Sequence, residues 1–124
     1  MKTIILMAAA TVLLAVNAGS AQAQDIVQQG VAANEVKRCL DDFASNGLKV
    51  SYIKANQQPG GKITYDFVFS PDDGSNKRVS WGLSAQDYRQ MDSDLQKIGY
   101  TRVCSNAVFV GGGPRYCALW VKPN

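Results

Sequence analysis

The sequence contains no histidine among its 124 residues. This absence excludes Ser-His-Asp and Cys-His catalysis, a histidine general base and histidine metal ligands. Charge is also sparse: charged residues make up 19% of the chain, the net charge is only +3, and no run of Lys or Arg occurs, so a nucleic-acid partner is not expected. Three cysteines are one ligand short of the four that close a structural zinc site, so we predict no metal and no cofactor.

Long apolar runs are missing everywhere except at the N-terminus. Lys2 precedes an almost unbroken apolar stretch at 4–16, and Ala-Gln-Ala follows at 21–23. This is the pattern of a secretory signal peptide, whose apolar segment is shorter than the roughly 20 residues of a transmembrane helix. We therefore predict a signal peptide at 1–23, a single small domain at 24–124, a secreted or periplasmic location, and no transmembrane anchor after processing.

The periodicity of the remaining chain predicts its elements. Helical spacing covers 25–46 and is clearest from Asn34 onward, with 24–33 as an extension of the same helix. A second helix begins at Ser84, which can cap it together with Asp87, and ends at Gly99. Alternating patterns predict strands at 48–53, 63–69, 79–83, 100–110 and 115–122. The order α-β-β-β-α-β-β predicts an α+β domain whose antiparallel sheet of about five strands carries two helices on one face.

The cysteine count predicts one disulfide and one remaining thiol, because export places the chain in an oxidising compartment. If Val110 pairs with Arg115 across the last hairpin, Cys104 and Cys117 lie four positions out of register, about 13 Å apart and beyond disulfide reach. Cys39 lies on the apolar stripe of the first helix. We therefore predict that Cys39 forms a disulfide with one of the two strand cysteines, Cys104 or Cys117, and that Cys104 is the favoured partner, which would leave Cys117 as a buried thiol.

Aromatic residues lie on most predicted strands, and core packing is the commoner role for any one ring. A sheet has two faces, however, and two helices on one side leave the other free for a ligand. We predict the binding residues Trp81, Tyr116, Trp120 and Arg115. Carboxylates offer no comparable site, since neighbours such as Asp41 and Asp42 diverge on a helix, so no catalytic residue is predicted.

The second half of the domain resembles the repeat unit of polyglycine hydrolases and related bacterial tandem-repeat proteins. The resemblance covers about 79–122 and is carried by Trp81-Gly82-Leu83-Ser84, Tyr88, Leu95, Gly99-Tyr100, Val103, Val110-Gly111-Gly112, Arg115-Tyr116, Ala118 and Trp120. In that family several copies stand beside a serine-hydrolase domain resembling β-lactamases, whereas one copy stands alone here. The resemblance therefore implies a structural or binding unit whose sheet engages a peptide or glycan, without the hydrolytic activity.

Three functions are compatible with these observations. The first is an exported, non-enzymatic binding module for a protein, peptide or glycan in the envelope or outside the cell, for example an inhibitor or immunity-type protein. The alternative is a small carboxylate-dependent hydrolase acting in the cell envelope. The third is a structural subunit of an envelope assembly. The absence of histidine and of converging acids favours the binding module.

Overall fold

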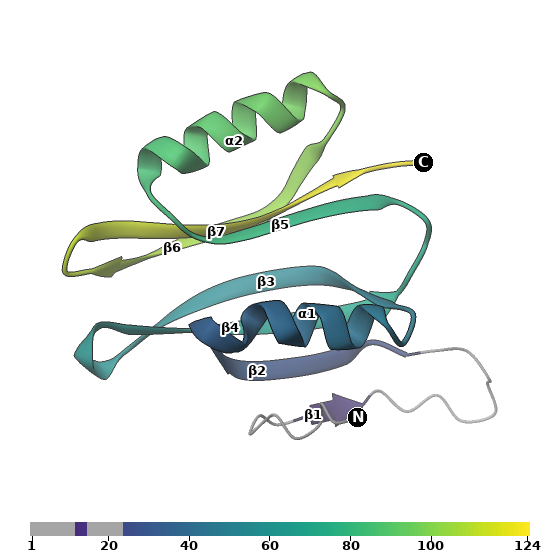
Figure 1. Ribbon diagram of the computed structural model, residues 1–124, viewed down its shortest axis with the longest axis horizontal. Coiled ribbons are helices and arrows are strands. Elements are labelled where there is room, and N and C mark those ends of the chain that lie inside the picture. The colour runs from purple at the N-terminus through teal and green to yellow at the C-terminus, as the bar shows by residue number, and fades with distance from the viewer. Residues whose placement is uncertain (1–11, 15–23) are drawn as a thin grey trace.

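The computed structural model describes residues 12–14 and 24–124. The strands are β1 (Val12–Leu14), β2 (Ile26–Ala32), β3 (Leu48–Gln58), β4 (Lys62–Pro71), β5 (Asn76–Leu83), β6 (Thr101–Val110) and β7 (Gly113–Lys122), and the α-helices are α1 (Val36–Ala44) and α2 (Ala85–Lys97) (Figure 1). Of the predicted signal peptide, only β1 lies within these ranges, paired with β2. The predicted cleavage motif at 21–23 lies outside them. No helix in the described part is long and apolar enough to cross a membrane.

The predicted single five-stranded sheet is wrong, because the strands form two sheets. The first has the order β1-β2-β4-β3, and the second has the order β5-β7-β6. All pairs within them are antiparallel. The chain crosses from the first sheet to the second between β4 and β5, at a turn in which Asp73 accepts hydrogen bonds from the amide and hydroxyl of Ser75.

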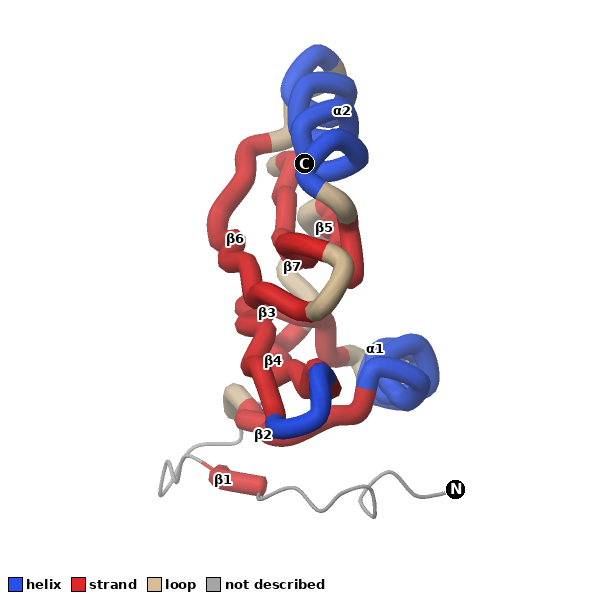
Figure 2. Tube along the Cα trace, turned by 90° about the vertical axis from the view of Figure 1, so that its left-hand side faces the viewer, coloured by secondary structure: helices blue, strands red, loops and turns tan. Residues whose placement is uncertain are grey.

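The two helices do not share one face, which corrects the predicted architecture. Helix α1 lies beside the first sheet, whereas α2 covers the side of the second sheet that faces away from the first (Figure 2). Phe43 of α1 stacks on Phe69 of β4 with ring centroids 4.1 Å apart, in the main core shared by both sheets. Leu95 of α2 packs on Ala118 and Trp120 of β7 in a second, smaller core. Strand β7 is therefore buried on both faces.

Strand β2 replaces the predicted extension of the first helix, and the element order changes accordingly. Ile26, Gln28 and Val31 pair with the inward-facing aromatic residues of β4. A register shift between Gln28 and Val31 accommodates Gly30, whose φ of 70° suits a bulge. The bulge interrupts the period of two at 28–30. The alternation of apolar and polar residues that would predict a strand is therefore broken in this segment.

A side chain joins the two sheets. The amide of Asn106 in β6 accepts a hydrogen bond from the Ala55 N–H of β3 and donates one to the Ala55 carbonyl, each 2.9 Å long. These are the two bonds that a paired backbone residue would supply. Further contacts join Cys104 to Ile53 and Phe109 to Gln57, so β3 and β6 run in the same direction. The second sheet is thereby fixed against an edge of the first.

The register of the last hairpin also differs from the prediction. Val110 pairs with Gly113 instead of Arg115, leaving a loop of only Gly111 and Gly112. Pro114 belongs to β7 rather than to the loop. Proline has no backbone N–H to donate to a neighbouring strand. It is tolerated at position 114 because the pairing of β5 with β7 extends only to Tyr116, so no β5 carbonyl would accept a hydrogen bond there.

Candidate functional site

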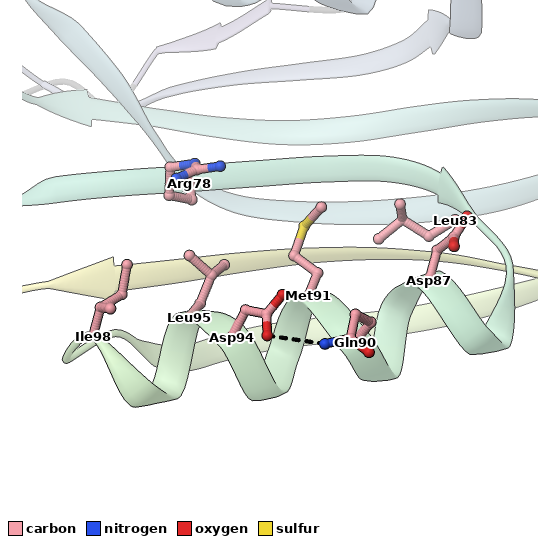
Figure 3. Close-up of a pocket in the computed structure, with 8 residues that line it drawn as sticks. All are labelled: Arg78, Leu83, Asp87, Gln90, Met91, Asp94, Leu95 and Ile98. Carbon is pink, nitrogen blue, oxygen red and sulfur yellow. Dashed lines mark hydrogen bonds between the residues drawn. The ribbon is translucent and has the colours of Figure 1, made fainter.

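An open groove of about 520 Å³ lies between α2 and β5 (Figure 3). Its lining residues are Arg78, Leu83, Asp87, Gln90, Met91, Asp94, Leu95 and Ile98. Met91, Leu95 and Ile98 point from α2 toward β5, and Leu83 lies at the end of β5. The charged side chains are Asp87 and Asp94 of α2 and Arg78 of β5, and all three residues are exposed. Because β5 leads directly into α2, one strand–turn–helix unit supplies both walls.

Local sequence explains the position of α2. The Ser84 hydroxyl accepts a hydrogen bond from the Asp87 N–H at 3.1 Å, which confirms the predicted N-terminal cap. Leu95 is buried beneath the helix, whereas Ile98 at its end keeps 55% of its surface exposed. One turn before Leu95, Met91 contacts the Ser80 hydroxyl of β5, with 3.2 Å between Sδ and Oγ. The floor is thus apolar and opens to solvent at the Ile98 end.

The rim carries charge that no residue of the described part of the chain neutralises. Asp87 and Asp94 come from α2, and Arg78 from β5. Asp94 accepts a hydrogen bond from Gln90 at 2.9 Å. Within the described ranges none of the three charged side chains forms an ion pair at 4.0 Å or less. The groove therefore presents carboxylates and one guanidinium to a ligand.

The outer edge of β5 has no strand partner in the described part of the chain, because β5 ends the order β5-β7-β6. In an antiparallel pair every second residue turns its N–H and C=O away from its neighbour. A register shift between Ser80 and Leu83, where Gly82 has a φ of 71°, ends the regular stretch. The open edge consequently runs over 76–80 beside the groove.

A polar cluster beneath α2 holds the helix on the sheet. The fully buried Trp120 donates its indole N–H to Asp92 Oδ1 at 2.9 Å. Arg102 and Gln96 donate to the other carboxylate oxygen at 2.9 and 3.0 Å. The bond from Trp120 is the largest of the causes that hold the pKa of Asp92 below its usual range. Asp92 therefore anchors the groove wall.

The predicted binding residues are dispersed. Trp120 is fully buried, and Trp81 is half-buried against the main core on the other side of the second sheet. Tyr116 stacks on Tyr88 of α2, with ring centroids 4.5 Å apart. Arg115 is half-buried beside the hairpin loop. These four side chains do not form one surface, and none of them lines the groove.

All three cysteines are free thiols in the structure, so the predicted Cys39–Cys104 bond is not formed in it. Burial raises the pKa of Cys39 to about 12 and that of Cys117 to about 11. The corrected register places Cys104 opposite Leu119, only two positions from Cys117. Cys104 and Cys117 are thus offset by about 7 Å along the strands. The predicted register gave an offset of about 13 Å, which was the argument against a bond between them. Which pair bonds in an oxidising compartment stays a prediction.

Catalytic geometry is not evident in the groove. Asp87 and Asp94 are seven residues apart on one helix, about 10.5 Å along its axis, and Asp94 accepts a hydrogen bond from Gln90, which lies between them in the chain. A Ser-x-x-Lys sequence occurs at Ser51–Lys54, but it lies in β3, where three residues span about 10 Å. The Ser51 hydroxyl contacts Ser70 instead, at 2.7 Å. No cluster of three potential metal ligands occurs in the described ranges.

Sequence reasoning missed the groove as a site. The apolar stripe of the second helix and its Ser84 cap were visible, but they only predict packing on a sheet. Nothing in the spacing of Arg78, Asp87 and Asp94 predicts that they share a rim, because that depends on β5 being an edge. Comparisons with protein-family models, curated proteins and solved structures found no match. The resemblance to the repeat unit therefore stays a prediction.

Proposed function

We propose that this chain is a non-enzymatic binding module, exported through its N-terminal signal peptide, which binds another protein through the groove between α2 and β5. The observation that carries the proposal is the combination of an apolar floor, an unneutralised charged rim and an adjacent strand edge. A concave site with an apolar lining and a few polar groups at its edge is the usual form of a ligand-binding site.

The form of the groove favours binding over catalysis. Both of its carboxylates come from the same helix and are exposed, so they do not face each other across the groove, and the chain has no histidine to act as a general base. The lining includes no aromatic residue, and glycan sites commonly stack sugars on aromatic rings. A protein or peptide is therefore the ligand class that this surface fits best.

The proposal can be tested by capture from an envelope extract with residues 24–124 immobilised. A double variant, Asp87→Lys with Ile98→Lys, raises the net charge by three at exposed groove positions. A control variant, Asp25→Lys with Ser93→Lys, adds the same charge at exposed positions outside the groove lining. We expect a partner that is retained by the wild type and the control but lost with the groove variant. Equal capture by all three proteins, or no specific capture, would contradict the proposal.

A further inference from the structure

We propose that the groove binds an extended peptide segment of its partner, which adds as a further strand to the outer edge of β5 and places a basic side chain against Asp87. This inference rests on the proposed binding function and specifies its ligand. It draws on the open backbone edge, the spacing of α2 and β5, and the charge of the rim.

The backbone of β5 supplies the first element of recognition. Residues 76–80 pair in regular register with β7 on one side and with no described strand on the other. A strand added there would lie about 4.8 Å from β5 and would exchange hydrogen bonds through alternate residues. The bulge before Leu83 limits this ladder to about five residues. Strand addition of this length is a recurring mode of peptide recognition.

Side chains supply the second element. Alternate residues of an added strand would point toward α2, because Ser80 and Leu83 of β5 already face that helix. One such residue would lie over the apolar floor formed by Met91 and Leu95. Its neighbour two positions along, about 7 Å away, would lie near the Asp87 end of the rim. A basic side chain there would meet a carboxylate that has no ion-pair partner within the described ranges.

The opposite end of the groove is expected to discriminate less between acidic and basic side chains of the peptide. Arg78 and Asp94 both line that end, so charges of both signs are available there (Figure 3). Specificity is therefore expected at Asp87. A second copy of this chain is a poor occupant, because antiparallel pairing of two β5 edges would bring Lys77 and Arg78 of each copy close to those of the other. Like charges across such an interface oppose pairing.

The test uses residues 24–124 and two nine-residue peptides with alternating Thr and apolar residues. The peptides differ only in whether Lys or Glu stands two positions from the central Leu. We expect the Lys peptide to bind about fivefold more tightly, with amide shifts and slowed hydrogen exchange at 76–80. Asp87→Lys should reverse the preference, and Asp25→Lys, with the same change of charge, should not. A preference that Asp87→Lys leaves unchanged would overturn the role of Asp87.

Backbone pairing is tested separately by N-methylated versions of the Lys peptide. Only alternate peptide residues donate to β5, so methylating one alternate set should abolish binding and methylating the other should not. Equal effects of both sets, or no binding of the unmethylated peptide, would refute strand addition. If a partner is still lost specifically with the groove variant in the capture experiment, the binding function stands and only the extended-peptide inference fails.

Discussion

The contact between Trp120 and Asp92 provides the sharpest test of how α2 is held. Replacing Asp92 with Ala leaves the fully buried indole N–H of Trp120 without its acceptor. An unsatisfied buried donor costs about 1–3 kcal/mol of folding free energy. The half-exposed Arg102 pair adds at most about 1 kcal/mol. The higher helix propensity of Ala returns about 0.5 kcal/mol.

The net loss expected for Asp92→Ala is therefore about 1–3 kcal/mol, which corresponds to a Tm lowered by about 5–15 °C in a domain of this size. Urea and thermal unfolding followed by tryptophan fluorescence would measure it. Asp94→Ala is the matched control, since it makes the same exchange on the same helix but loses only an exposed bond to Gln90. If the two variants differ by less than about 0.5 kcal/mol, the anchoring role of Asp92 is refuted.

The same cluster makes stability depend on pH. Because the pKa of Asp92 is lowered in the folded state, mainly by the Trp120 N–H, the unfolded chain binds the proton more readily. The stabilisation is present above the unfolded-state pKa of about 3.9 and is lost as the pH falls through the lower folded-state pKa. Asp92→Asn removes this titration. The free-energy difference between wild type and Asp92→Asn should therefore shrink below about pH 4, and a constant difference down to pH 2 would contradict this account.

Three further predictions concern other parts of the fold. Asn106→Ala should destabilise the protein by about 2–3 kcal/mol and increase hydrogen exchange at Ala55, because the N–H and C=O of Ala55 lose their partners. Unchanged exchange would refute the role of Asn106 in joining the two sheets. Gly82→Ala should cost about 1–2 kcal/mol through its positive φ, whereas Gly111→Ala, equally unobstructed but without a positive φ, should be nearly neutral in urea unfolding. In the reduced protein a thiol reagent should label Cys104 before the two buried cysteines, as peptide mass mapping would determine.

Much of the local structure could be predicted from the sequence, because it depends on contacts between near neighbours. The Ser84 cap, the stripe of the second helix and the alternation of β4 each involve residues that lie close in the chain. Strand β2 escaped prediction since a bulge at Gly30 breaks its period. The hairpin register escaped because proline is typical of loops, although on one side β7 has no partner at Pro114 within the described part of the chain.

The division into two sheets could not be predicted from alternation, which tells which residues share a face but not which strands are neighbours. The contact between β3 and β6 depends on the Asn106 side chain, which carries no sequence signal. One available signal was overlooked in the last strand. Residues 117–120 are Cys-Ala-Leu-Trp, a continuous apolar run typical of a strand covered on both faces. It predicts a buried Trp120 rather than a ligand-facing one.

The walls of the groove are fixed by the same contacts that stabilise the second sheet. Trp120 holds α2 through its hydrogen bond to Asp92, and Tyr116 stacks on Tyr88 near the first turn of that helix. Ser80 of β5 contacts Met91 of α2 across the floor of the groove. A ligand would therefore meet two walls whose separation is already set. Binding to such a surface does not incur the ordering cost of assembling it. Weakening the Asp92 anchor should consequently reduce affinity in the groove even when the protein remains folded, which links the stability of this sheet to the proposed function.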